Sequence, residues 1–229
     1  MYKRDVVYII KDVKDFEKLR NIKYYVNPII VIDNDIDFKN AKFTPIDAEK
    51  FDVVINGGNY TLGNLTINDR NSDNVGLFSK VNSLVVSDLS LINFNIKGGV
   101  NTGSIAGKVK QNATINKSVF SGIIDAEAYA GGVVGSCEDI TLNDSIVVTS
   151  VKGYDIIGGV AGMVSQLDLN NTHIRCTAKG VGKAVYSDAG YNSRRENDRI
   201  QYMLKEALSK QPVECSEKEM KKLARLLKE

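Results

Sequence analysis

Val75-Gly76-Leu77-Phe78 is the first of four similar phrases. The others are Thr102-Gly103-Ser104-Ile105, Ala130-Gly131-Gly132-Val133 and Ile157-Gly158-Gly159-Val160. Successive first glycines are 27, 28 and 27 residues apart. A fixed period of this length is typical of proteins built from stacked repeats. The sequence therefore indicates an architecture first and an activity only weakly.

Each repeat places the same kinds of residue at the same offsets. Two positions after the first glycine stands a large or branched apolar residue, and a second glycine follows at Gly107, Gly135 and Gly162. The apolar residues are Phe78, Ile105, Val133 and Val160, and the first glycines are Gly76, Gly103, Gly131 and Gly158. We expect the glycines at corners, where positive φ or a close backbone approach excludes a side chain.

The segments between these phrases are short, β-branched and alternating, which indicates strands. Ile140-Thr141-Leu142 and Ile146-Val147-Val148 are examples. One period of strands and glycine turns makes one coil, so equivalent positions of successive coils pair in parallel and stack. A β-sandwich of hairpins is disfavoured, because Asn-Gly or Asp-Gly turn signals are missing between the strands apart from Asn56-Gly57.

Gly76-Leu77-Phe78, Gly132-Val133-Val134-Gly135 and Gly159-Val160-Ala161-Gly162 resemble the GLUG motif of bacterial β-solenoid proteins. The preceding stretch, which includes Asn56-Gly57-Gly58-Asn59-Tyr60-Thr61-Leu62, resembles the segment that usually opens a GLUG array. The resemblance covers residues 5–185. It implies a right-handed parallel β-helix of a kind often found in bacterial surface proteins and adhesins, in a family without shared catalytic residues.

The expected fold is mainly β, with three parts. Residues 1–28 form an N-terminal α/β cap, in which Asp12 caps a short helix. Residues 29–187 form a right-handed solenoid of about five to six coils by the observed period. Residues 191–229 form two amphipathic helices. The first helix carries Ile200, Met203, Leu204, Ala207 and Leu208, and the second carries Met220, Leu223, Ala224 and Leu227.

The role of residues 191–229 stays open between three alternatives. The two helices could cap the last coil, mediate self-association, or form a hairpin that docks a partner through Met220, Leu223 and Leu227. The second helix also holds a capping box, Ser216-Glu217-Lys218-Glu219, which supports its start.

Composition excludes some functions. The 229 residues carry a net charge of +2, which gives no field suited to nucleic acid. No apolar run approaches the roughly 20 residues of a membrane span, and the N-terminus does not read as a signal peptide. We expect a cytoplasmic protein if Met1 is the native start, and a cell-surface or secreted one if these residues come from a longer exported chain.

Candidate chemical groups are few. Asp33, Asp35 and Asp37 alternate on one face, but a calcium loop would need glycine where Phe38 stands, so we expect a solvated turn and no metal or cofactor. His173 is the only histidine and cannot build a zinc site alone. Cys137 occupies a position that valine fills in neighbouring coils, which predicts a structural thiol.

Two positions before the first glycines stand Asn74, Asn101, Tyr129 and Ile156. These residues form no acidic or aromatic ladder of the kind that β-helix enzymes acting on polysaccharides use. The favoured function is therefore a non-catalytic solenoid that binds a macromolecular partner, with protein as the favoured class. A surface adhesin or glycan-binding fragment is the alternative.

The stacked repeat yields a first test. We expect Val133→Asp to unfold the solenoid, because an unpaired carboxylate in the interior costs several kcal/mol, a large part of a domain's stability. Thermal unfolding followed by circular dichroism measures it. A cooperative transition at the wild-type temperature would contradict the inward placement of Val133.

Overall fold

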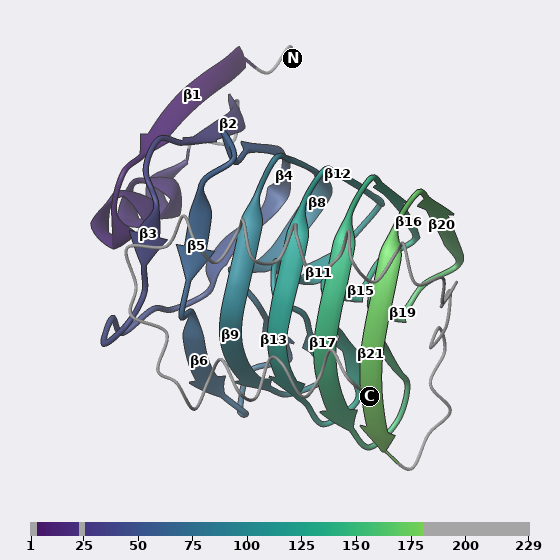
Figure 1. Ribbon diagram of the computed structural model, residues 1–229. Coiled ribbons are helices and arrows are strands. Elements are labelled where there is room, and N and C mark those ends of the chain that lie inside the picture. The colour runs from purple at the N-terminus through teal and green to yellow at the C-terminus, as the bar shows by residue number, and fades with distance from the viewer. Residues whose placement is uncertain (1–3, 23–25, 181–229) are drawn as a thin grey trace.

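Short strands pair in parallel along the described chain, which comprises residues 4–22 and 26–180 of a computed structural model. Each strand hydrogen-bonds to the equivalent strands of the coils before and after it, as β13 (Val119–Asp125) does with β9 (Ser90–Gly98) and β17 (Ile146–Gly153). Six strands follow one another along one wall, β3-β5-β9-β13-β17-β21, so the coils form a β-solenoid of about six turns (Figure 1). Parallel pairing excludes a hairpin sandwich.

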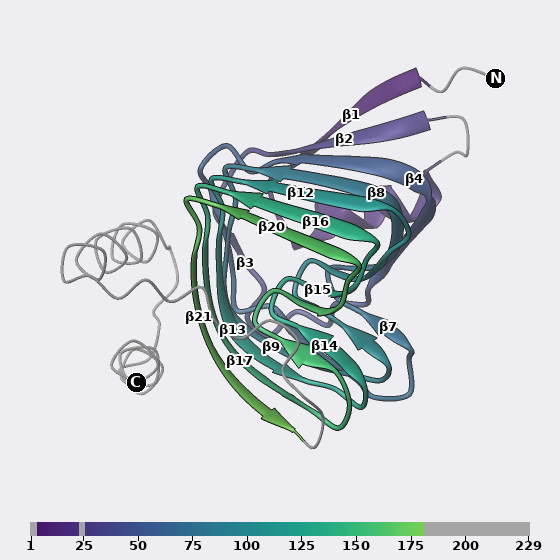
Figure 2. The same ribbon diagram turned by 90° about the vertical axis from the view of Figure 1, so that its right-hand side faces the viewer.

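The coils build three sheets, which we name A, B and C and which surround one core (Figure 2). Sheet A contains β1 (Arg4–Ile10), β2 (Val26–Ile32), β4 (Ile46–Asn56), β8 (Phe78–Ser87), β11 (Ala106–Val109), β12 (Asn112–Asn116), β15 (Val134–Ser136), β16 (Asp139–Asn143), β19 (Ala161–Met163) and β20 (Gln166–Asn170). Sheet B contains β3 (Ile36–Asp37), β5 (Thr61–Gly63), β6 (Thr66–Asp69), β9, β13, β17 and β21 (His173–Gly180). Sheet C contains β7 (Asn74–Val75), β10 (Asn101–Thr102), β14 (Tyr129–Gly131) and β18 (Ile157–Gly158).

Apolar ladders fill the interior. In sheet B, Leu91, Phe120, Val147 and Ile174 occupy equivalent positions of four successive coils, and all four are buried. Each coil alone would leave its apolar face in water, so the coils are stable only as a stack. Because the side-chain period of a strand is two, this register also fixes which residues point outward.

Aromatic side chains close the N-terminal end of the core. Asp12 caps the 3-10 helix η1 (Val13–Asn21), and its Oδ1 accepts hydrogen bonds from the backbone N–H groups of Lys14 and Asp15. Phe16 of η1 lies 5.6 Å from Phe38 and 5.8 Å from Phe43, measured between ring centroids. Strand β1 pairs residue by residue with β2, so sheet A continues to Arg4.

The second glycine of the repeat lies where sheet C packs against sheet A. A Cβ at Gly107, Gly135 or Gly162 would come closer than 3.0 Å to backbone atoms of β7, β10 or β14, respectively. Each of these strands belongs to the preceding coil, and its backbone occupies the space that a side chain would need. Close approach, and not positive φ, is therefore the reason for glycine at this corner.

The first copy of the repeat differs by one residue within the turn. Val75 pairs with Thr102, but Phe78 pairs with Ala106, because Gly76-Leu77 replaces a three-residue turn that includes Ser104. The alignment that stacks Phe78 on Ile105 is therefore wrong by one position. Phe78, Ile105, Val133 and Val160 are nevertheless all buried.

The same shift places Ser79 at the position equivalent to Gly107. Sheet C begins at β7, so no strand of sheet C precedes this coil to pack against Ser79. A side chain is tolerated there, and Ser79 Oγ lies 3.4 Å from the carbonyl oxygen of Ile46.

The corner between sheets A and B uses a different solution. Asp88, Lys117, Asp144 and Asn171 have positive φ, between 46° and 55°. Beside them, the amide Nδ2 of Asn143 donates to Asn116 Oδ1 at 2.8 Å, and that of Asn170 donates to Asn143 Oδ1 at 2.9 Å. Ser118 and Ser145 each donate a hydroxyl hydrogen bond within their own coil and accept one from the backbone of the coil before. Polar ladders thus link the coils here.

Residues 191–229, including Met220, Leu223 and Leu227, lie outside the described residues, so the two predicted helices stay predictions.

The glycine corner can be tested by adding one methyl group. We expect Gly135→Ala to lower the free energy of unfolding by about 1–3 kcal/mol or more, because the methyl must displace backbone atoms of Thr102 and Gly107. Urea denaturation measures the change. The control is Ser79→Ala at the equivalent open position, where we expect less than about 1.5 kcal/mol. Equal losses in the two variants would show that the corner is not tightly packed.

Candidate functional site

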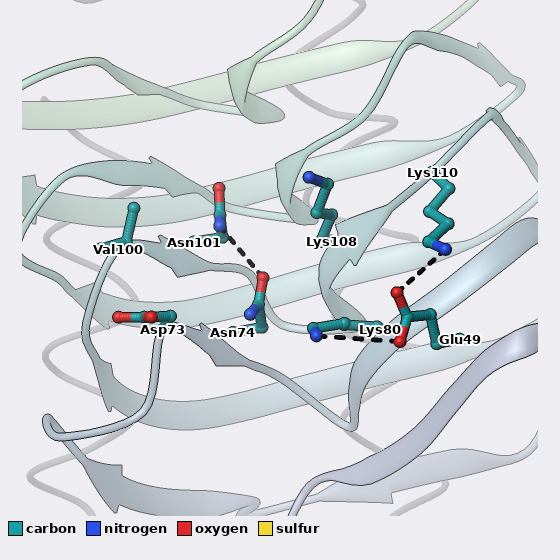
Figure 3. Close-up of a pocket in the computed structure, with 8 residues that line it drawn as sticks. All are labelled: Glu49, Asp73, Asn74, Lys80, Val100, Asn101, Lys108 and Lys110. Carbon is teal, nitrogen blue, oxygen red and sulfur yellow. Dashed lines mark hydrogen bonds and ion pairs between the residues drawn. The ribbon is translucent and has the colours of Figure 1, made fainter.

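A cleft of about 250 Å³ opens where the outer surfaces of sheets C and A meet. It is lined by eight residues and is called the lysine cleft below (Figure 3). These residues are Glu49, Asp73, Asn74, Lys80, Val100, Asn101, Lys108 and Lys110. They come from three successive coils, which the parallel register brings together although Glu49 and Lys110 are far apart in the sequence.

The register places the cationic side chains of the lysine cleft. Lys80 of β8 pairs directly with Lys108 of β11, so their strands are neighbours about 4.8 Å apart. Lys110 follows two residues after Lys108 and points from the same face. In the two following coils the position equivalent to Lys108 is occupied by Ser136 and Met163, so only two successive coils carry lysine there.

Glu49 partly neutralises this cluster. Its carboxylate lies 2.9 Å from Lys110 Nζ and 3.9 Å from Lys80 Nζ (Figure 3). The hydrogen bond and charge of Lys110, and then the charge of Lys80, hold the pKa of the Glu49 carboxyl below its ordinary value. Solvent reaches both ion pairs, which makes them weak and easy to exchange for another anion.

Lys108 differs from the other two lysines. Among the described residues, no carboxylate lies within 4.0 Å of its Nζ, and its side chain is exposed. The lysine cleft therefore offers one cation without an ion-pair partner in the described chain, beside two cations that share one carboxylate.

Two amides form the opposite wall of the lysine cleft. Asn101 Nδ2 donates to Asn74 Oδ1 at 3.0 Å across neighbouring coils, and both side chains are half-buried. This bond leaves the Asn74 NH₂ group and the Asn101 amide oxygen to bond to water or a ligand. Cations and fixed amides together suit the binding of an anionic group that also carries hydrogen-bonding atoms.

Of the site residues predicted from the repeat, two lie next to the lysine cleft. The repeat glycines Gly107 and Gly135 lie directly beneath the strands that carry Asn74 and Asn101, so they support the lysine cleft without lining it. The three lysines are not among the site residues that the sequence predicts. A sequence signal for them does exist. When the first copy is aligned with its one-residue shift, Lys80 and Lys108 occupy equivalent positions of neighbouring coils.

The three alternating aspartates make separate contacts. Asp35 Oδ1 accepts from the backbone N–H of Thr61, Asp37 Oδ1 accepts from Lys39 N and Asn64 Nδ2, and Asp33 pairs with Lys11. Within the described ranges, no group of three or more His, Cys, Asp or Glu residues is placed to hold a metal ion. His173 pairs with Ile146 on the side of sheet B that faces away from the core.

Cys137 lies against the core in a half-buried position. Burial raises the pKa of its thiol to about 12, and the charge of Asp139 adds to this shift. The thiolate, which is the nucleophilic form, is therefore rare at neutral pH.

Comparison with known proteins shows no family for this chain. No protein-family model matches the chain. Over 93 residues, or 40% of its length, the chain is 30% identical to Halomucin of Haloquadratum walsbyi, and it spans 1% of that protein. The crystal structure of a Bacteroides ovatus protein provisionally assigned as an immunoglobulin A1 protease shares 14% sequence identity at a TM-score of 0.36. That match covers 77% of this chain and 84% of the other.

A long apolar helix of the kind that could cross a bilayer does not occur in the part of the chain that the structure describes.

The position of Cys137 predicts both its reactivity and its effect on stability. We expect iodoacetamide at pH 8 to leave Cys137 unlabelled in the folded protein and to label it fully in denaturant, measured by peptide mass spectrometry.

The ordinary thiol pKa is 9.0, so the unfolded chain ionises first as pH rises towards 12. The free energy of unfolding should therefore fall across this range.

Cys137→Val is the control for that second effect, because valine occupies the equivalent positions of earlier coils. The variant should show a shallower fall in stability at alkaline pH. Identical slopes for the two proteins, or rapid labelling of folded Cys137, would contradict the buried environment of the thiol.

Proposed function

We propose that this protein is a non-catalytic β-solenoid that binds an acidic segment of a protein partner in the lysine cleft. The observation that carries the proposal is Lys108, a cation without a described carboxylate partner, held in register with Lys80 opposite the amides of Asn74 and Asn101. Charge-assisted hydrogen bonds to carboxylates are roughly twice as strong as neutral ones.

The ion pair of Glu49 supports an exchange mechanism. A partner carboxylate that approaches Lys110 competes with Glu49 for this cation, and a displaced Glu49 still has Lys80 beside it. The cost of binding is then mainly the ordering of lysine side chains, about 0.5–1.5 kcal/mol for each immobilised side chain. Salt should weaken such binding, because the groups are exposed and screened.

The lining of the lysine cleft favours a peptide over a sugar. Sugar rings present apolar C–H faces, whose burial needs apolar surface on the protein. Among the described residues of this lining, Val100 is the one apolar residue and none is aromatic. A peptide backbone, by contrast, can pair its N–H and C=O groups with the free atoms of Asn74 and Asn101. The adhesin or glycan-binding alternative becomes an outcome of the test below.

We further infer that the chain is related to the GLUG-motif β-solenoids and winds in the right-handed sense of that family. Support comes from the repeated phrases around Gly76, Gly131 and Gly158 and from the parallel stacking of their coils. The absence of acidic residues in register with Asn74 and Asn101 supports a binding role over catalysis.

Binding of a fluorescein-labelled hexaglutamate peptide, followed by fluorescence anisotropy at low salt, tests the proposal. We expect Lys108→Glu to weaken binding about tenfold, equivalent to about 1.4 kcal/mol, because one attraction becomes a repulsion. Glu49→Gln should strengthen binding, since Lys110 and Lys80 lose their internal counter-ion.

The matched control is Lys152→Glu, the same charge change at an exposed lysine on the outer face of sheet B. It should leave the affinity nearly unchanged. Equal loss of affinity in Lys108→Glu and Lys152→Glu would show that binding depends on the net charge of the protein and not on the lysine cleft. If hexaglutamate does not bind, but polygalacturonate binds in a way that depends on Lys108, the partner is a glycan and not a protein.

A further inference from the structure

The outer face of sheet B carries an apolar patch. In β13 and β17 the side chains of Phe120 and Val147 point into the core, so their neighbours along the strands point outward. Several outward residues near the corner with sheet A are apolar, and we name them the sheet B patch: Ile92, Val119, Ile146 and Val148.

The sheet B patch is buried although it faces away from the core. The exposed fractions of Ile92, Ile146 and Val148 are 1%, and that of Val119 is 6%. None of the four belongs to the core cluster. On the outer face of sheet A, by comparison, the valines Val54 and Val85 are 36% and 37% exposed. Outward β-branched residues are therefore not buried by the strand geometry alone, and the sheet B patch must have a cover.

The described elements do not provide that cover. The described elements with the most contacts to β13 and β17 are their neighbours in sheet B and strands of sheet C, which lie at the edges or on the inner side. Figure 2 shows no described strand or helix on the outer side of sheet B. Ser121, which lies between Ile92 and Val148 in the register, is also fully buried, and its Oγ has no described hydrogen-bond partner.

We propose that residues 191–211 of the same chain dock on the sheet B patch as an amphipathic helix. The last described strand, β21, belongs to sheet B and ends at Gly180, and the 229-residue chain continues for 49 residues from there. The segment carries Ile200, Met203, Leu204, Ala207 and Leu208 at helical spacing. About 20 residues from Gly180 to Ile200 can span up to about 66 Å. Strands β9, β13 and β17 lie within three strand spacings of β21, about 14 Å.

The docking accounts for the stability of the first predicted helix. An isolated helix of this length is marginal in water, so the first helix gains its stability from the sheet B patch. The lysine cleft lies between sheets A and C and shares no residue with the sheet B patch, so the inference stands independently of the proposed function.

Methyl nuclear magnetic resonance on the full-length protein tests the docking. We expect nuclear Overhauser effects between the methyl groups of Ile146 or Val148 and those of Leu204 or Leu208. A sample that mixes labelled and unlabelled chains distinguishes the two origins of these effects. We expect them only between methyl groups of the same chain. Effects between chains would show that a second copy covers the sheet B patch and would overturn the proposal.

Matched variants complete the test. Leu204→Asp should shift the methyl signals of Ile146 and Val148 and expose them to a soluble paramagnetic probe, because the carboxylate removes the helix from the patch. Ser209→Asp introduces the same group on the polar side of the segment and should leave the signals unchanged. Unchanged signals in Leu204→Asp, or wild-type contacts only with residues before 181, would overturn the proposal.

Discussion

The structure depends on the close approach of the sheet C backbone to sheet A. At Gly107, Gly135 and Gly162 the strand of the preceding coil occupies the volume of a side chain, so each coil is held against the one before it by backbone contact. The approach gives the solenoid a tight, re-entrant corner. The residues on either side of the glycines then face each other across a narrow space, and the lysine cleft is this space.

The corner between sheets A and B is built differently from the glycine corner. Between sheets A and B the chain turns with non-glycine residues at positive φ, and asparagine and hydroxyl side chains bond from coil to coil. That corner is convex, and its polar groups are largely occupied by one another. At the glycine corner, Asn74 and Asn101 share one hydrogen bond, and Lys108 has no described carboxylate partner. Binding capacity is thus concentrated at one corner because the other uses its polar groups for stacking.

The sequence predicts the solenoid because stacking repeats the same demands every 27 or 28 residues, and glycines with branched apolar residues report those demands directly. The sequence also shows that the first copy is one residue shorter, because Val81 stands five residues after Gly76 and Val109 stands six after Gly103. It does not show that the missing residue lies before Phe78, which only the strand pairing places. The lysine cleft was missed for the same reason. Lysines at exposed positions resemble ordinary surface charge until the register places Lys80 beside Lys108. The asparagine ladder at Asn116, Asn143 and Asn170 was visible as a 27-residue period, but its polar residues also suit ordinary turns.

In the proposed function, the glycine corner, and not the asparagine corner, forms the binding site. Side-chain amide signals report on both corners at once in a titration of the labelled protein with hexaglutamate, followed by nuclear magnetic resonance. We expect progressive shifts of the Asn74 and Asn101 amides, with those of Asn143 and Asn170 unchanged. Equal shifts at the two corners, or shifts confined to Asn143 and Asn170, would contradict it.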